Sequence, residues 1–354
     1  MSGEDLIAVR KDERLDEAAV AAWLRGQGLL AAGETLTVRQ FAGGKANLTY
    51  LLELAGRPLV LRRPPLGPVA PGAHDMVREY QVLSRLHTGF DKAPRALALC
   101  TDLDALGAPF FVMTHRPGIV VRERMPAAFA DDPRSPTAMA DALVDTLAEL
   151  HAVDPSAVGL ADLGQPEGFM ARQVAGWYRR WQAATDSPLP AMDSLHDWLA
   201  ARVPAPQRVA LVHNDYKLDN VVLAADDPGR VVAVLDWDMC TLGDPLSDLG
   251  ALLTYWIGPD DPAPFRAMAT MPVDPRFPDR AALVARYAQR TGLDLSGIAW
   301  YHVLGLFRLA VILAQIHVRW RRGQTADPRF ARFGEFAALA ADWALRVAGA
   351  QRRA

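Results

Sequence analysis

Short runs that alternate apolar and polar side chains dominate the first third of the chain. Residues 35–41 and 48–54 alternate in this way, and residues 58–63 add a third run. A two-residue period is typical of strands with one buried face, and turn-forming residues separate the three runs. The pattern therefore predicts a three-stranded antiparallel meander, followed by another strand at residues 108–114.

Apolar residues at helical spacing take over elsewhere in the chain. They predict helices at residues 15–30, 73–87 and 135–151, and a mostly helical segment at residues 162–206. This last segment carries four large rings close together, namely Phe169, Trp177, Tyr178 and Trp181. Residues 249–257 form one more apolar helix, so helices dominate the second part of the chain.

Residues 300–318 form the longest apolar run, and polar residues interrupt it at His302, Arg308, Gln315 and His317. A membrane-spanning helix rarely carries so many polar side chains. We therefore expect a helix of the protein core here. A proline-rich segment at residues 259–278 precedes this region and predicts an irregular connection.

Length and composition limit the fold classes that this chain can adopt. A chain of 354 residues that is 51% hydrophobic and 22% charged is long enough for two lobes. We expect an α+β fold, with a small antiparallel-sheet lobe at residues 1–114 and a larger, mostly helical lobe at residues 115–354. The opening residues contain no apolar signal core, so a soluble, cytoplasmic protein is expected.

Net charge and cysteine content narrow the expected partners. A formal net charge of -3 argues against nucleic acid as a partner, and no membrane partner is expected. The two cysteines, Cys100 and Cys240, are predicted to be buried apolar residues and not a disulfide framework. The oligomeric state stays open, and a homodimer is one of the possibilities.

The stretch from residue 211 to residue 250 carries the clearest chemistry. Two short apolar runs, at residues 209–212 and 231–235, each lead into an aspartate, Asp215 after the first and Asp236 after the second. Asn220 lies five residues beyond Asp215, which is the Asp-x-x-x-x-Asn spacing of a kinase catalytic loop. Phosphoryl transfer needs a carboxylate for the acceptor hydroxyl and separate oxygen ligands for Mg²⁺.

These requirements assign roles to four side chains. Asp215 is predicted to orient and deprotonate the acceptor, while Asn220 and Asp236 are predicted to hold the metal. Lys217 is two residues past Asp215, so it is predicted to reach the transferring phosphate as a point charge.

This stretch resembles the aminoglycoside phosphotransferase and choline kinase superfamily, and more narrowly the kinase domains fused to some acyl-CoA dehydrogenases. The resemblance implies a protein-kinase-like two-lobe fold and the ATP- and Mg²⁺-dependent phosphorylation of a hydroxyl on a small molecule. It makes His213 a buried brace and gives Asp244 and Asp248 loop-bracing roles. Asn214 departs from the family, which usually carries glycine at this position.

The resemblance extends to a nucleotide site in the first lobe. Two adjacent glycines, Gly43 and Gly44, open a loop that ends at Asn47, and such loops let backbone N–H groups approach phosphate. Arg62 occupies the position of the family's usual lysine, and Glu79 is its expected helix partner. The backbone around Met113 and His115 is expected to bind adenine at the hinge.

Two other interpretations remain open. The sequence Asp236-Trp237-Asp238-Met239-Cys240-Thr241 has the Asp-x-Asp-x-x-Thr form of haloacid-dehalogenase phosphatases, whose first aspartate is the nucleophile. Those enzymes also need a downstream lysine, and no lysine follows Lys217. The other alternative is a pseudokinase, which binds a nucleotide or a partner without turnover.

The charge near the carboxyl end of the chain suggests the acceptor. From residue 300 onward the chain contains nine arginines and three acidic residues, which gives this segment a formal charge of +6. A cleft of this sign favours anionic ligands over polycationic antibiotics. The resemblance points to a hydroxylated acyl group, carried on coenzyme A or as a hydroxy acid, with residues 317–322 meeting the phosphates. It also makes the rings of residues 162–206 candidates for lining the acceptor pocket. The alternative is that the arginines form a solvated face.

Overall fold

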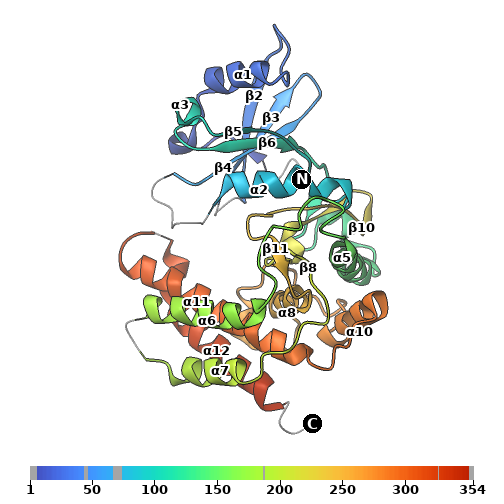
Figure 1. Ribbon diagram of the computed structural model, residues 1–354, viewed down its shortest axis with the longest axis vertical. Coiled ribbons are helices and arrows are strands. Elements are labelled where there is room, and N and C mark those ends of the chain that lie inside the picture. The colour runs from blue at the N-terminus through green and yellow to red at the C-terminus, as the bar shows by residue number, and fades with distance from the viewer. Residues whose placement is uncertain (1–5, 44–46, 67–73, 186–187, 326, 351–354) are drawn as a thin grey trace. The chain divides into compact units, whose positions relative to one another are not determined.

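The computed structural model describes residues 6–43, 47–66, 74–185, 188–325 and 327–350 (Figure 1). The chain packs into two compact units. Unit 1 comprises Met1–Val120, Asp154–Leu160 and Asn220–Cys240, and unit 2 comprises Val121–Val153, Ala161–Asp219 and Thr241–Ala354. The expected boundary after residue 114 differs from this division, because two later segments of the chain pack into unit 1.

Unit 1 is built on a six-stranded sheet in the order β1-β2-β3-β4-β6-β5, in which every neighbouring pair is antiparallel. The strands are β1 (Leu6–Ile7), β2 (Leu36–Phe41), β3 (Leu48–Leu54), β4 (Leu59–Arg63), β5 (Ala96–Cys100) and β6 (Phe110–Thr114). The predicted meander is present as β2, β3 and β4. Sequence analysis did not predict β1 and β5.

The two-residue period of the strands places a helix on each face of this sheet. Phe110 and Val112 of β6 pack in one buried cluster with Val20 and Leu24 of α1 (Glu17–Gly26). The intervening Phe111 points the other way and meets Tyr80 of α2 (Met76–Leu83), with ring centroids 6.4 Å apart. Figure 1 shows α1 and α2 on opposite sides of the sheet. The short helix α3 (Leu103–Leu106) lies beside α1.

A three-stranded antiparallel sheet completes unit 1. Its order is β10-β9-β7, formed by β7 (Ile119–Val120), β9 (Val221–Ala224) and β10 (Asp227–Val234). The backbone N–H of Val234 also donates to the carbonyl of Lys92, 2.9 Å away. This hydrogen bond ties the hairpin to the earlier part of the unit, so Asp236 just beyond β10 is held in unit 1.

Unit 2 is mostly helical, with a two-stranded antiparallel ribbon of β8 (Ala210–Val212) and β11 (Thr241–Gly243). Its helices are α4 (Ala127–Ala130), α5 (Ser135–Ala152), α6 (Phe169–Ala184), α7 (Pro190–Ala200), α8 (Leu246–Tyr255), α9 (Ala263–Arg266), α10 (Arg280–Thr291), α11 (Ile298–Arg321) and α12 (Phe333–Ala350). The antiparallel sheet of unit 1 and the helices of unit 2 confirm the predicted α+β class.

Helix α11 is the central helix of unit 2 and packs against α6, α8 and α12. It is long and apolar enough to cross a membrane by composition alone, but 67% of its most apolar window is buried inside the protein. Two glycines let α8 and α11 approach closely: a Cβ at Gly250 would lie 2.5 Å from the Tyr301 backbone, and one at Gly305 would lie 2.8 Å from the Gly250 carbonyl oxygen. The close approach brings side chains of both helices to the loop after β8.

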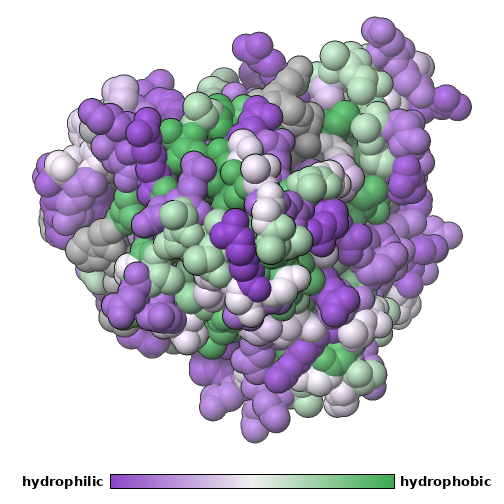
Figure 2. Space-filling view, turned by 90° about the horizontal axis from the view of Figure 1, so that it is seen from above, coloured by the Kyte–Doolittle hydropathy of each residue, from purple (hydrophilic) through white to green (hydrophobic). Residues whose placement is uncertain are grey.

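Large apolar side chains that remain exposed are spread over the sequence: Leu66, Val77, Leu103, Val203, Val209, Met239, Val273 and Leu345. On the face that Figure 2 draws, hydrophobic residues alternate with hydrophilic ones. Single exposed apolar residues of this kind are ordinary on protein surfaces.

Candidate active site

The loop that follows β8 is held in place by a buried aspartate of α8. The carboxylate of Asp248 accepts hydrogen bonds from the backbone N–H of His213 at 2.6 Å and of Asn214 at 2.7 Å. His151 lies on the other side, with Nε2 3.1 Å from Asp248 Oδ2, and Tyr287 is 2.7 Å from His151 Nδ1. The loop-bracing contact expected of Asp248 is therefore present, and it fixes the backbone immediately before Asp215.

Asn214 adopts a left-handed backbone, with φ +65°. Glycine enters this region without strain, and asparagine is among the side chains that tolerate it best. This conformation suits asparagine as well as the glycine that the family resemblance implies at this position. Asp236, at the end of β10, is left-handed as well, with φ +68°. Each predicted functional aspartate therefore lies at or next to a sharp change of chain direction.

Asp215 and Lys217 form a close pair in unit 2. Lys217 Nζ donates to both carboxylate oxygens of Asp215, at 3.0 and 2.9 Å, and lies over the ring of Tyr255 at 5.2 Å. Burial alone would lower the pKa of Lys217, but the charges of Asp215 and Asp219 outweigh burial and raise it above its ordinary value. The ammonium therefore stays charged beside the predicted base.

Unit 2 also holds a buried arginine to which sequence analysis gave no role of its own. Arg308 of α11 donates from Nη2 to the carbonyl oxygen of Asn214 at 2.9 Å, and its guanidinium lies 5.1 Å from the ring centre of Trp177. Burial lowers its pKa, although Tyr255, Asp215 and Asp248 act in the opposite direction. A lone arginine inside an apolar run is a sequence signal for a functional residue. Burying a charge costs free energy, so a buried arginine is seldom retained without a specific partner or role.

In unit 1 the predicted pair of Arg62 and Glu79 is present and extends to a third residue. Arg62 Nε donates to Glu79 Oε2 at 2.9 Å, and Arg62 Nη2 donates to Asp236 Oδ1. The side chain of Glu79 is 1% exposed and that of Arg62 10% exposed, whereas Asp236 is 28% exposed. The outer end of the cluster is therefore the carboxylate of Asp236.

The charges of this cluster do not balance. Burial alone would lower the pKa of Arg62, but Glu79, Asp236 and Asp238 together raise it above its ordinary value. Burial, assisted by the negative charges of Asp236 and Asp238, raises the pKa of Glu79 to about 7. Three carboxyl groups thus surround one guanidinium, and sequence analysis had assigned no role to the third, Asp238.

The donor set suits a divalent cation that is shared with another ligand. Asp236 and Asp238 offer carboxylate oxygens. Asn220 lies in a 3₁₀ turn (Leu218–Asn220), and its backbone carbonyl oxygen accepts a hydrogen bond from the N–H of Leu235 at 2.8 Å. Among the described residues, no three His, Cys, Asp or Glu side chains are arranged to hold a metal by themselves. Mg²⁺ commonly takes one or two carboxylates and completes its shell with phosphates and water, so the residues fit this ion.

The other predicted nucleotide residues also belong to unit 1. Gly43 lies in an exposed turn after β2, whereas Gly44 falls outside the described residues. Asn47 is buried, with Oδ1 2.9 Å from His74 Nδ1. Met113 pairs with Val60 and Ala96 in the sheet. Burial lowers the pKa of the neighbouring His115 to about 4, so this imidazole is neutral at physiological pH.

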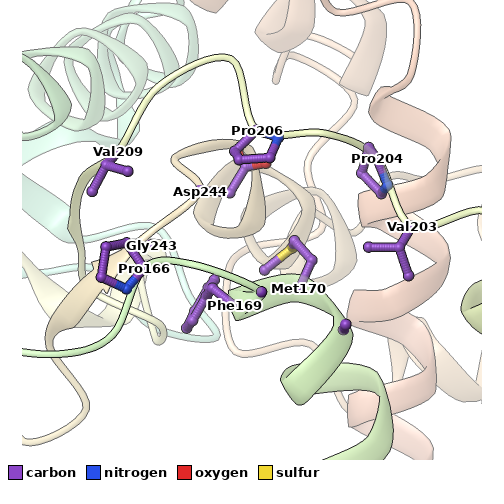
Figure 3. Close-up of a pocket in the computed structure, with 11 residues that line it drawn as sticks. Pro166, Phe169, Met170, Val203, Pro204, Pro206, Val209, Gly243 and Asp244 are labelled. Atoms are coloured by element: carbon purple, nitrogen blue, oxygen red, sulfur yellow. The ribbon is translucent and has the colours of Figure 1, made fainter.

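A pocket in unit 2 is distinct from the residues described so far. It is lined by the start of α6 with Phe169 and Met170, by the segment from Val203 to Val209, and by Gly243 and Asp244 (Figure 3). Its volume of about 50 Å³ is far below the several hundred cubic ångströms of typical metabolite pockets. Gly243 pairs with Ala210, at the end of the ribbon away from the Asp215 loop. This pocket is therefore not a candidate for the acceptor site.

Comparison with known proteins places these residues in a family context. The model of the family described as APH, phosphotransferase enzyme family, matches residues 37–286. Acyl-CoA dehydrogenase family member 10 of Mus musculus is 32% identical over 347 residues, which cover 96% of this chain and 32% of that protein. The chain thus spans about a third of the length of this relative.

Solved structures agree with the family match. A candidate aminoglycoside phosphotransferase from Ralstonia eutropha JMP134 is 32% identical, with a TM-score of 0.79 over 95% of this chain and 99% of that one. A thermostable mutant of aminoglycoside phosphotransferase APH(4)-Ia, solved as a ternary complex with AMP-PNP and hygromycin B, has a TM-score of 0.60 at 16% identity, covering 93% of this chain and 98% of that one. The predicted protein-kinase-like fold is confirmed by these similarities.

Proposed function

This chain belongs to the phosphotransferase enzyme family, and on that premise we propose that it transfers the terminal phosphoryl group of ATP, with Mg²⁺, to a hydroxyl group of a small molecule. The observation that carries the proposal is Asp215, held beside Lys217 on a loop that Asp248 fixes through two backbone hydrogen bonds. Positioning and charge stabilisation account for most of the catalysis in this class of reaction.

The roles of the unit 2 residues follow from their chemistry. Asp215 accepts a hydrogen bond from the acceptor hydroxyl and takes its proton as the oxygen attacks phosphorus. Lys217 keeps its charge and can move from Asp215 to an oxygen of the transferring phosphoryl group, because a lysine side chain is flexible. Asp248 acts through the backbone by holding the loop in one conformation.

The roles of the unit 1 residues concern the nucleotide. Arg62, oriented by Glu79, presents a guanidinium that can bind phosphate oxygens in place of the family's usual lysine. Asp236 and Asn220 would hold Mg²⁺, which when bound neutralises charge on the phosphates. Met113 and His115 would present backbone groups to adenine. Nucleotide use is supported by the AMP-PNP complex of the APH(4)-Ia structure.

For the acceptor we propose an anionic hydroxy compound, either a hydroxy acid or a hydroxyacyl group on coenzyme A. The formal +6 charge after residue 300 favours an anion over a polycationic aminoglycoside. Several of these arginines are solvent-facing: Arg329 pairs with Asp327 and Arg332 pairs with Glu335, all on the surface. Arg308 is different, because it is buried against the loop that carries Asp215.

The two alternatives are distinguished by simple observations. A haloacid-dehalogenase phosphatase would use Asp236 as a nucleophile, but this carboxylate is engaged with Arg62, and the family match favours phosphoryl transfer from a nucleotide. A pseudokinase would bind nucleotide without turnover. The presence of Asp215, Asn220 and Asp236 favours turnover over that alternative.

The direct experiment is to incubate the full chain with ATP, Mg²⁺ and a library of hydroxylated metabolites, and to identify by mass spectrometry any compound that gains a phosphate. The Asp215→Ala variant, checked for ATP binding, is the matched control. A product formed by the wild type and lost in the variant supports the proposal. ATP binding without any phosphorylated product supports the pseudokinase, and a trapped aspartyl-phosphate on Asp236 supports the phosphatase.

A further inference from the structure

Arg308 and Arg180 of unit 2 lie over the same indole ring. The guanidinium carbon of Arg180 is 4.4 Å from the ring centre of Trp177, and that of Arg308 is 5.1 Å from it. Trp177 is 6% exposed, and its Nε1 donates to Gln173 Oε1 at 3.1 Å, which fixes the orientation of the ring. Two cations from α6 and α11 thus converge on one aromatic side chain.

Neither guanidinium is in direct contact with a carboxylate in the described residues, although Asp215 and Asp248 attract Arg308 from farther away. Within the part of the chain that the structure describes, neither Arg180 nor Arg308 forms an ion pair. The hydrogen-bond acceptor of Arg308 is the neutral carbonyl of Asn214, and Arg180 acts on Arg308 as a like charge. Arg308 is only 9% exposed. Buried charges are normally paired, and Arg308 contacts no carboxylate, so its guanidinium is suited to an added anion. The exposed Arg180 beside it contributes further positive charge.

Stacking leaves the hydrogen-bonding capacity of a guanidinium largely intact. A cation over a ring uses the face of its plane, while the N–H donors point outward along the edges. Oxyanions accept two parallel N–H bonds from such an edge. The ring therefore positions each guanidinium. The N–H donors that remain, apart from the Arg308 Nη2 that bonds to Asn214, are suited to a carboxylate or a phosphate.

We propose that Arg308, Arg180 and Trp177 form a subsite that binds the oxyanion of the acceptor, a carboxylate or a phosphate, next to the loop that carries Asp215. Arg308 donates a hydrogen bond to the residue that precedes Asp215. An acceptor bound to Arg308 is therefore positioned relative to the proposed base, Asp215, by a single side chain. The subsite selects anionic hydroxy compounds and disfavours polyamines. This inference deepens the proposed function and rests on it for its biological role, but the binding step can be tested without turnover.

The test measures binding to the full chain by isothermal titration calorimetry in the absence of ATP. Three probes are compared: 3-hydroxybutyrate, its neutral amide and 3-hydroxybutyryl-CoA. The wild type is expected to bind at least one of the two anions about tenfold more tightly than the amide, the size expected for one charge-assisted contact. Phosphorylation is followed separately, so a chain that binds the anion without turnover contradicts the proposed function and leaves the subsite intact.

The variants use the exposed neighbour Arg179 as a control. Arg180→Gln should weaken binding of the anion about 5–20-fold and leave the amide unchanged, whereas Arg179→Gln should change neither more than about twofold. Arg308→Lys keeps a positive charge but removes the planar edge of the guanidinium, and should weaken binding of the anion by a similar factor. If only 3-hydroxybutyryl-CoA responds to Arg180→Gln, the oxyanion is a phosphate, and if 3-hydroxybutyrate responds, it is a carboxylate.

Two results would overturn the subsite. One is that the wild type binds the amide as tightly as both anions. The other is that Arg180→Gln and Arg308→Lys keep the wild-type preference for the anion. Arg180 is exposed, so its substitution does not threaten folding, and the answer does not depend on the buried Arg308 variant.

Discussion

Two buried arginines in this chain are held in opposite ways. Arg62 in unit 1 contacts two carboxylates, Glu79 and Asp236, and their charges raise its pKa. Arg308 in unit 2 contacts a carbonyl and an indole, and burial lowers its pKa. The first site has negative charge to spare and suits a metal ion, while the second has positive charge to spare and suits an anion. We therefore assign a ligand to each site from the sign of its surplus charge, and not from burial alone.

The largest expected effect comes from the base in unit 2. Asp215→Ala should lower kcat by about 10²–10⁴-fold, because it removes the group that takes the acceptor proton. ATP affinity should change little, since the proposed nucleotide residues belong to unit 1. Steady-state kinetics and a nucleotide-binding assay check both halves of this statement. Turnover near the wild-type level in this variant would mean that Asp215 is not the base.

The contrast between the two arginines is tested most directly by replacing each of them with methionine. Arg62→Met leaves the buried carboxyl group of Glu79 and the partly exposed one of Asp236 without their cation, and should lower the free energy of unfolding by about 3–5 kcal/mol. Arg308→Met leaves one carbonyl without a donor and removes the contact with Trp177, and should cost about 1–2 kcal/mol. Urea denaturation of both variants measures the difference. Equal losses would show that the surrounding carboxylates do not set the stability.

Asp236→Asn tests the surplus negative charge of unit 1. Replacing an anionic metal ligand by a neutral one should weaken Mg²⁺-dependent ATP binding by roughly 10–100-fold. ATP binding without metal should stay the same or improve, because a repulsive charge is gone. Titrations with and without Mg²⁺ separate the two effects. A loss that is identical in both titrations would contradict a role in metal binding.

Glu79 gives the smallest effect, and it depends on pH. Its pKa is raised from the ordinary 4.5 to about 7, so the folded protein holds a proton that the unfolded chain releases. The stability that this group contributes is therefore fully present below pH 4.5 and is lost as pH rises through 7. Relative to Glu79→Gln, the wild type should lose stability between pH 5 and 8, on the order of 1–3 kcal/mol. Denaturation curves at the two pH values would refute this if both proteins responded alike.

Local patterns in the sequence predicted much of the fold and part of the candidate site. The meander of β2, β3 and β4 and helix α5 followed from periodicity, and the core helix α11 followed from its long apolar run, which is buried over most of its length. The Arg62–Glu79 pair followed from the family resemblance. Strand β5, Ala96–Cys100, was missed because its side chains are mostly small and give a weak alternating signal.

Contacts between residues that are far apart in the sequence could not be predicted from such local patterns. The bond from Arg308 to Asn214 joins positions 94 apart in the chain, and no local repeat encodes it. The same holds for Asp154–Leu160, whose place in unit 1 depends on packing that the sequence does not reveal. The left-handed turn at Asn214 had a visible signal, since the family resemblance implies glycine there, but the reason appears only in the backbone angle.

The sheet formed by β7, β9 and β10 has a consequence for protein synthesis. Strand β7 ends at Val120, but its partner β9 begins only at Val221, so unit 1 cannot be completed when its first strands leave the ribosome. Translation of the intervening residues takes roughly 5–20 s at ordinary elongation rates. During this interval the edge of β7 has no strand to pair with, which is a recognised opportunity for misfolding. We therefore expect nascent chains that stop between these two strands to be better chaperone substrates than chains released beyond Cys240.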